Sequence, residues 1–246
     1  MLETAIAILL ASLRLAPTIA FAPPFTMVRM PGLARGCLTI ALAAGAMGLG
    51  AGRGVTGWQG NLVTAAASEL ALGLALALSL QLAFAMIAMA GRALDIQAGF
   101  GLAFLIDPTT KAQVPLIASL FSYAAAAIFF ATEGPYDVFA ALAASFDALP
   151  LGAAASPDTV GQTLSFLGTV SILALGVVGL ASTVLFLIDL VIAMLARTLP
   201  QMNMLVLGFQ VKAMVTLLLL PATLALAAGV IARILRLGIE AMARVA

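Results

Sequence analysis

The sequence is poor in the residues that carry most protein chemistry. It has no histidine and a single cysteine, Cys37, among 246 residues. Zinc sites built from His and Cys, Ser-His-Asp triads and internal disulfides are therefore excluded. Charged residues make up 9% of the chain, and 11 basic against 10 acidic residues leave a net charge of +1. No basic surface for nucleic acid is implied, and we expect neither an enzyme nor a cofactor.

Apolar residues, in contrast, dominate the composition. They make up 64% of the chain, and the mean hydropathy is +1.21. Soluble domains are typically about 45–50% apolar and about 25% charged. The composition therefore predicts an integral membrane protein in contact with a lipid bilayer. The first apolar run carries Glu3 and Arg14 and is followed by prolines, so we expect no cleavable signal peptide.

The apolar residues fall into about six segments. These are 2–28, 37–52, 65–90, 116–132, 163–196 and 213–232. No strand alternation and no repeat is visible, so we expect an all-α fold with one domain over residues 1–246. The segments 37–52 and 116–132 are short for a crossing, which takes about 20 residues. Prolines are expected to interrupt the first segment at Pro17, Pro23 and Pro24 and the last at Pro221.

Charge in the connections conflicts with six plain crossings. Lys and Arg are concentrated in the first, third and fifth connections, which the positive-inside rule places in the cytoplasm. Six crossings would then put the arginine-bearing tail outside. Either one segment does not cross, or partner proteins support the helices. A short helix over 138–149 is also predicted, in the acidic connection between the fourth and fifth segments.

The stretch from Ala90 to Pro115 combines polar groups and backbone breakers between two apolar runs. Arg92 and Asp95 are three residues apart and can pair on one helix face. Gly99 and Gly101 weaken the helix that follows. One interpretation is an ordinary loop. The other is an irregular apolar backbone within protein at membrane depth, as in a gate or plug. Its candidate residues are Gly99, Phe100, Gly101, Leu102, Phe104, Leu105, Ile106, Asp107 and Pro108.

A second polar group lies around residues 195–212. Pro200 is expected to end the long helix that precedes it, and the amides of Gln201 and Asn203 can satisfy freed backbone groups. This is either a plain capped helix end or a subunit contact. The residues we expect in subunit or intramembrane polar contacts are Arg14, Arg92, Asp95, Gln97, Asp189, Arg197, Pro200, Gln201, Asn203 and Lys212.

Four segments in chain order resemble one family. The segment LARTLPQMNMLVLGFQVK (195–212) is similar to the C-terminal signature of the FliR/SctT export-gate proteins, and AGRALDIQAGFGLAFLIDP (90–108) resembles their other characteristic stretch. Residues 14–35 resemble the family's start, and SFDALPLG (145–152) is similar to a further segment. Together they cover essentially the whole chain.

The resemblance implies a function that composition alone does not. Proteins of this family assemble with FliP-type, FliQ-type and FlhB-type subunits into a type III export gate, through which unfolded polypeptides cross the bacterial inner membrane. It also implies a plug in the loop at 98–114. We expect a flagellar gate component in the basal body, with an injectisome component as the alternative. A small-molecule or ion transporter using Arg14, Glu69 and Asp189 is the rival class.

Overall fold

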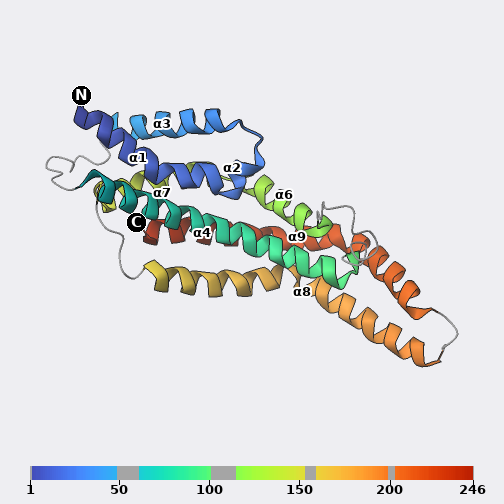
Figure 1. Cartoon of the computed structure of the whole chain (residues 1–246). Coiled ribbons are helices and arrows are strands. Elements are labelled where there is room, and N and C mark those ends of the chain that lie inside the picture. Colours follow the sequence, from blue (N-terminus) through green and yellow to red (C-terminus); the bar gives the residue numbers. More distant parts are fainter. Residues whose placement is uncertain (1, 49–60, 101–114, 153–158, 199–202, 246) are drawn as a thin grey trace. The chain divides into compact units, whose positions relative to one another are not determined.

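The structure is a computed structural model that describes residues 2–48, 61–100, 115–152, 159–198 and 203–245. Within these ranges the chain is helical and contains no strand (Figure 1). The helices are α1 (Leu2–Phe21), α2 (Pro23–Met27), α3 (Gly32–Gly48), α4 (Leu62–Gln97), α6 (Leu116–Ala131), α7 (Gly134–Ala148), α8 (Thr159–Thr198) and α9 (Met204–Val245). The predicted all-α fold is confirmed.

Four of the described helices are long and apolar enough to cross a membrane. They are α1, α4, α8 and α9, and the consecutive helices α6 and α7 would add a fifth span if they count together as one broken span. α3 is apolar but shorter than these. The predicted membrane-helical class, with some segments broken or too short to span, is confirmed.

Two of the predicted proline interruptions are wrong. α1 continues through Pro17, and α9 continues through Pro221. A proline removes one backbone hydrogen bond, but the neighbouring turns keep theirs, and an apolar setting strongly favours paired backbone groups. The interruption at Pro23 is confirmed, because Ala22 before it has an extended backbone (φ −67°, ψ 130°), as residues before proline prefer.

Helix packing divides the chain into two compact units. Unit 1 contains Met1–Phe84, Phe129–Thr169 and Leu235–Ala246, and unit 2 contains Ala85–Ile128 and Val170–Ile234. The long helices α4, α8 and α9 each contribute residues to both units.

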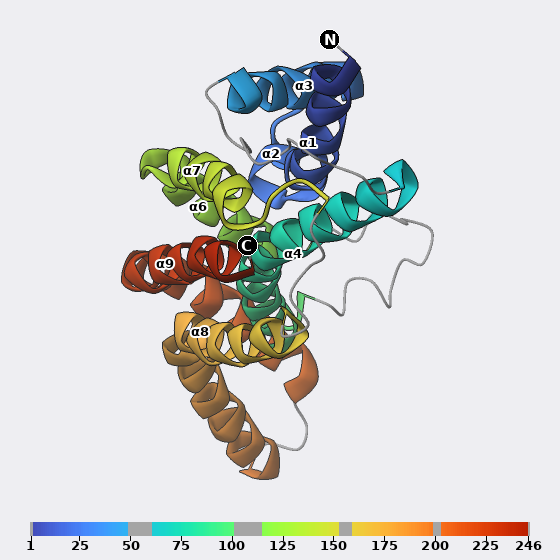
Figure 2. The ribbon, with the colours of Figure 1, turned by 90° about the vertical axis from the view of Figure 1, so that its left-hand side faces the viewer.

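In unit 1 the amino-terminal helices pack together. α1 contacts α3 and α2, and Figure 2 shows α3 next to the amino-terminal part of α1, with α2 following α1. Aromatic rings extend this core: Phe25 of α2 lies edge-on to Phe129 at 6.2 Å and contacts Phe139 at 5.9 Å between ring centroids. These contacts attach α2 to the region where α6 ends and α7 begins.

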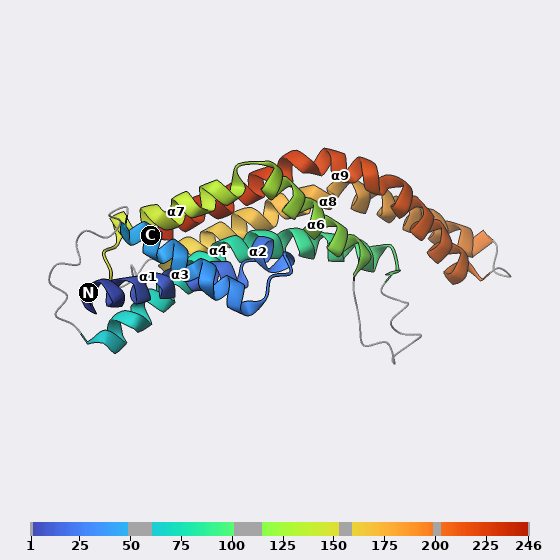
Figure 3. The ribbon, with the colours of Figure 1, turned by 90° about the horizontal axis from the view of Figure 1, so that it is seen from above.

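In unit 2 the far parts of α8 and α9 form an antiparallel pair (Figure 3). Gly208 of α9 lies against Ile192 of α8, and a Cβ at Gly208 would be 3.3 Å from the Ile192 side chain. The end of α4 meets the start of α6 even more closely, because a Cβ at Gly91 would lie 2.6 Å from the Cα of Ala118. Gly91 therefore permits a backbone approach that a larger residue would prevent.

Candidate functional site

The most densely bonded polar group in unit 1 is centred on Arg14. Its side chain and that of Glu69 are both fully buried, and they form a bidentate ion pair. The Nε of Arg14 donates to Oε2 of Glu69 at 2.6 Å, and Nη2 donates to Oε1 at 2.9 Å. Two parallel charge-assisted hydrogen bonds are the strongest arrangement for this pair of side chains. The pair joins α1 to α4.

Arg14 also closes the end of a third helix. Its Nη1 donates to the backbone oxygens of Ser145 at 2.7 Å and Leu149 at 3.0 Å, where α7 ends. The last carbonyls of a helix lack partners within the helix and attract positive charge. The last turn of α7 has no basic residue of its own. Arg14 therefore acts as the cap of α7 from another helix.

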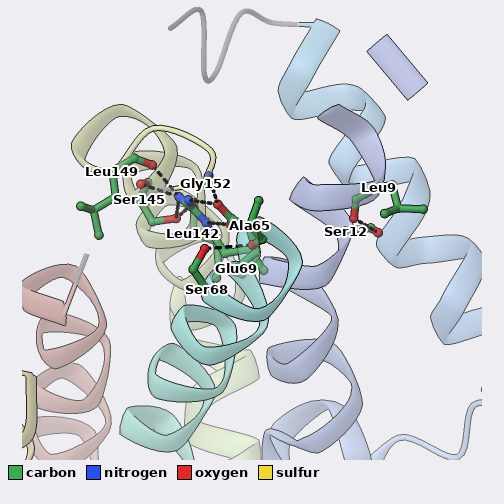
Figure 4. A network of polar contacts seen from close by, with 10 residues as sticks. Leu9, Ser12, Ala65, Ser68, Glu69, Leu142, Ser145, Leu149 and Gly152 are labelled. Carbon is green, nitrogen blue, oxygen red and sulfur yellow. Dashed lines mark hydrogen bonds and ion pairs between the residues drawn. The ribbon is translucent and has the colours of Figure 1, made fainter. Parts of the chain in front are cut away.

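Glu69 also accepts a hydrogen bond from a backbone group. The backbone N–H of Gly152 donates to Oε1 of Glu69 at 2.7 Å. Figure 4 shows Glu69, Ser145, Leu149 and Gly152 converging in this network. The guanidinium of Arg14 lies 4.6 Å from the ring centroid of Phe146, a favourable cation–π distance. Both buried charges are therefore compensated within the chain.

A close contact between helix backbones positions this pair. Gly73 of α4 lies against the backbone of Arg14, and a Cβ at Gly73 would be 2.4 Å from the Arg14 carbonyl oxygen. No side chain larger than hydrogen fits there without displacing α1. The glycine brings α4 close enough for Glu69, one turn earlier, to reach the guanidinium.

In unit 2 a buried acid caps a different helix. The carboxylate of Asp95, which is 4% exposed, accepts the backbone N–H groups of Ile117 at 2.9 Å and Ala118 at 3.0 Å. These N–H groups belong to the first turn of α6, where negative charge is favoured. The predicted Arg92–Asp95 ion pair is wrong. Arg92 is exposed, and both carboxylate oxygens of Asp95 accept hydrogen bonds from backbone N–H groups at the start of α6.

The connected helices α6 and α7 are thus capped by charged side chains from other helices. Asp95 caps the beginning of α6 in unit 2, and Arg14 caps the end of α7 in unit 1. The sign of each charge matches the helix dipole at that terminus.

The predicted gate loop is only partly described. α4 ends at Gln97, whose Nε2 donates to the carbonyl of Ser182 in α8 at 3.0 Å. Gly99 follows with φ 85°, a conformation that suits glycine, and Phe100 is half-buried. The remaining residues of the predicted loop lie outside the described residues: Gly101, Leu102, Phe104, Leu105, Ile106, Asp107 and Pro108.

At the far end of unit 2, Asp189 of α8 forms an ion pair with Lys212 of α9. The Asp189 side chain is 43% exposed and that of Lys212 is 21% exposed. Arg197 is exposed in the last turn of α8, where its charge suits the helix dipole. The carbonyl of Asn203 accepts the N–H groups of Val206 and Leu207 and begins α9. Pro200 and Gln201 lie outside the described residues.

The two helices around this ion pair expose an apolar surface. The largest exposed fractions belong to Leu218 (76%), Ile172 (73%), Leu175 (68%), Met214 (68%) and Leu226 (68%). In the candidate spans of α8 and α9, only 28% and 22% of the most apolar window is buried within the chain. Such faces require lipid or another protein subunit as a neighbour.

The sequence alone does not reveal several residues of the Arg14 network. Arg14 and Glu69 stand out as charges within apolar runs, but nothing in the sequence indicates that they bond each other across 55 positions. Nothing in the sequence indicates that Gly73 or the Leu149 carbonyl takes part in this network. Among the described residues, no three His, Cys, Asp or Glu side chains come together as metal ligands. The network is therefore suited to holding helices together.

Comparison with known proteins shows the family to which the chain belongs. Residues 5–237 match the family described as bacterial export proteins, family 1. The chain is 30% identical over 164 residues to the flagellar biosynthetic protein FliR of Bacillus subtilis (strain 168), a match that covers 64% of this chain and 62% of that protein.

Two further relatives carry the same name. FliR of Escherichia coli (strain K12) is 27% identical over 59% of this chain and 56% of its own length. FliR of Pectobacterium carotovorum subsp. carotovorum is 31% identical over 52% of this chain and 49% of its own length. The matched part thus spans between about half and three fifths of these relatives. The resemblance to the FliR/SctT family is confirmed, and the chain belongs to family 1 of the bacterial export proteins.

Proposed function

We propose that this chain is a membrane subunit of the flagellar type III protein export gate. In this role it forms part of the channel through which unfolded export substrates cross the bacterial inner membrane, within the flagellar basal body. The observation that carries the proposal is the family match over residues 5–237, together with relatives named as flagellar biosynthetic proteins. The role is structural, so no catalytic group is required of the chain.

The distribution of polar and apolar groups supports a subunit of a larger assembly. The chain satisfies its deepest charges internally, through the Arg14–Glu69 pair and the Asp95 cap. Its long helices meanwhile leave large apolar faces uncovered. Helices of FliP-type, FliQ-type and FlhB-type subunits are the neighbours we propose for these faces, with lipid covering the remainder.

The rival transporter has less support. A transporter that used Arg14 and Glu69 as a substrate or proton path would present them to water or to the substrate. Both side chains are instead fully buried and bonded to each other and to backbone groups. Asp189, the third residue of that hypothesis, is paired with Lys212.

The test of the proposal is co-purification. A tagged chain is extracted from its native cells in mild detergent, and the proteins that accompany it are identified by mass spectrometry. FliP-type and FliQ-type subunits of a flagellar system are expected in fixed ratio to the chain. Injectisome subunits would instead favour the alternative system. A homogeneous monomer without partners, and normal motility in cells that lack the chain, would overturn the proposal.

We also propose that the loop after α4 acts as the plug of this gate. Apolar side chains can exclude water from a constriction and so block ions, and glycines permit a large backbone change on opening. Deleting residues 104–111 is expected to leave assembly intact but make the membrane conduct ions. Conductance unchanged from that of the intact gate would refute a plug at this position.

A further inference from the structure

A small cavity with both polar and apolar lining residues lies in unit 1, and none of its lining residues belongs to the Arg14 network. Its volume is ≈ 140 Å³, and it is formed by the start of α8, the end of α9 and Ser79 of α4. Sites for whole small molecules usually measure about 300–1,000 Å³. This cavity is therefore large enough only for one polar group of a larger molecule.

The walls of the cavity present hydrogen-bond acceptors. Oε1 of Gln162 is buried and has no hydrogen-bond partner among the residues that the structure describes. The hydroxyls of Ser79, Ser165 and Thr169 donate their protons to the backbone carbonyls of Ala75, Gln162 and Ser165. Their lone pairs remain available as acceptors. A buried acceptor without a donor is unfavourable, so the group that fills the cavity should bring N–H or O–H donors.

One wall of the cavity also carries a positive charge. Arg244 lines it, and within the described part of the chain its guanidinium has only a long contact of 4.0 Å with Glu240, in a pair whose side chains are 73% and 50% exposed. Such exposed ion pairs contribute little to the free energy of folding. The guanidinium is therefore available for an anion, and its planar set of N–H donors suits phosphate.

The position of the cavity favours a lipid as the source of both groups. The candidate spans Gly161–Thr198 and Val206–Val245 begin and end at residues around the cavity. Each of these helices is longer than the hydrocarbon core of a bilayer, so its end can lie at the level of the headgroups. Leu164, beside the cavity-lining Ser165, is 63% exposed and can contact acyl chains.

We propose that this cavity binds the ammonium end of the phosphoethanolamine headgroup of a membrane phospholipid. The ammonium group supplies three N–H donors to Gln162 Oε1 and the hydroxyl oxygens, and the phosphate faces Arg244. The acyl chains extend along the exposed apolar face near Leu164. No other property of the export gate is needed for this assignment, so it is independent of the proposed function.

The test compares lipids that differ only in their donors. The purified full-length chain, with the subunits that accompany it, is titrated with phosphatidylethanolamine or phosphatidylcholine of identical acyl chains, and native mass spectrometry counts the bound lipid. Choline has no N–H donor. Ethanolamine lipid is expected to bind at least about tenfold more tightly, as the loss of one charge-assisted hydrogen bond implies. Equal affinity for the two lipids would overturn the proposal.

Variants identify the cavity as the site of binding. Gln162→Leu and Arg244→Gln should each lower affinity for the ethanolamine lipid by about tenfold, and Arg244→Lys should retain part of it. Two matched controls, Arg236→Gln on α9 and Gln81→Leu on α4, change exposed residues outside the cavity and should leave affinity unchanged. An equal loss in the two controls and in the first two variants, or no loss in the first two, would refute the assignment.

A further experiment tests whether the ligand of the cavity is a lipid or a soluble molecule with the same headgroup. Free phosphoethanolamine should compete only weakly, because it lacks the acyl chains. Competition as strong as that of the lipid would retain the headgroup chemistry but overturn the lipid as its source. Melting temperatures of all variants without added lipid show that the folded state is preserved. At the same lipid concentration, the ethanolamine lipid should raise the melting temperature of the unmodified chain more than that of Arg244→Gln.

Discussion

The Nε of Arg14 lies 2.6 Å from Oε2 of Glu69, and neither side chain has any contact with solvent. Removing one member of such a pair leaves a buried charge without compensation, at a cost of roughly 3–5 kcal/mol. We therefore expect Glu69→Ala to lower the free energy of unfolding by at least that amount. The measurement is the fraction of full-length protein that survives heating and limited proteolysis in detergent, which should fall.

The double variant tests whether the lost charge compensation is the cause. Arg14→Met combined with Glu69→Leu removes both charges and keeps apolar volume. It should be more stable than either single variant, because a buried ion pair can often be replaced by apolar residues at little cost. Glu3→Ala, which removes an exposed acid of α1, serves as the control and should change stability little. A double variant less stable than both single variants would refute this explanation.

A second prediction concerns the backbone contact beside the pair. Gly73→Ala places a Cβ 2.4 Å from the Arg14 carbonyl, so α1 must move away from α4 and the bonds to Glu69 lengthen. A loss of about 1–3 kcal/mol is expected, as for other overpacked sites. Gly168→Ala is the matched control, because a Cβ there meets nothing within 4 Å and alanine favours a helix by about 1 kcal/mol. The two substitutions should therefore change the melting temperature in opposite directions.

A third prediction distinguishes the cap from the ion pair expected from the sequence. Asp95→Ala leaves two buried N–H groups of α6 without an acceptor, and losing a helix cap typically costs about 0.5–2 kcal/mol. Gate assembly and secretion should fall with it. Arg92→Ala should leave both unchanged, because the Arg92 side chain is exposed. An equal loss of gate assembly and secretion in the two variants would mean that Arg92 and Asp95 act together after all.

A fourth prediction addresses the ion pair between α8 and α9. Lys212→Met leaves Asp189 as a single charge on an apolar helix, which costs roughly 2.5–3.5 kcal/mol on membrane insertion scales. The yield of partner subunits in a pull-down should drop. Exchanging the two residues, as Asp189→Lys with Lys212→Asp, should restore much of the yield because the opposite charges can pair again. If the exchanged variant recovers nothing, attraction between these two residues is not what matters.

The helices were largely predictable from the sequence, because long apolar runs in a chain with 9% charge have few alternatives to membrane helices. The prolines inside α1 and α9 show the limit of local rules. Pro17 and Pro221 weaken a helix locally, but the apolar surroundings decide whether the helix continues.

The polar contacts were predictable only in part. Arg14 and Glu69 were identifiable as residues that need a partner, yet their partners come from segments far apart in sequence. Asp95 was assigned to Arg92 because the two lie on one helix face. The start of α6 offers two buried N–H groups, and these donors satisfy the buried carboxylate of Asp95 better than an exposed guanidinium would. Sequence spacing shows which residues can meet, but not which alternative partner is closer.

The distance in sequence between the groups bonded to Arg14 sets an order of events during synthesis. The first helix leaves the ribosome long before the carbonyls of Ser145 and Leu149 exist, 131 and 135 positions later. At a synthesis rate of about 5–20 residues per second, on the order of ten seconds pass between the synthesis of Arg14 and that of its last hydrogen-bond partners. During that interval the nascent chain has to keep a charged group out of hydrocarbon. Translation speed and the insertion machinery therefore both act on Arg14, the residue that later joins the helices of unit 1.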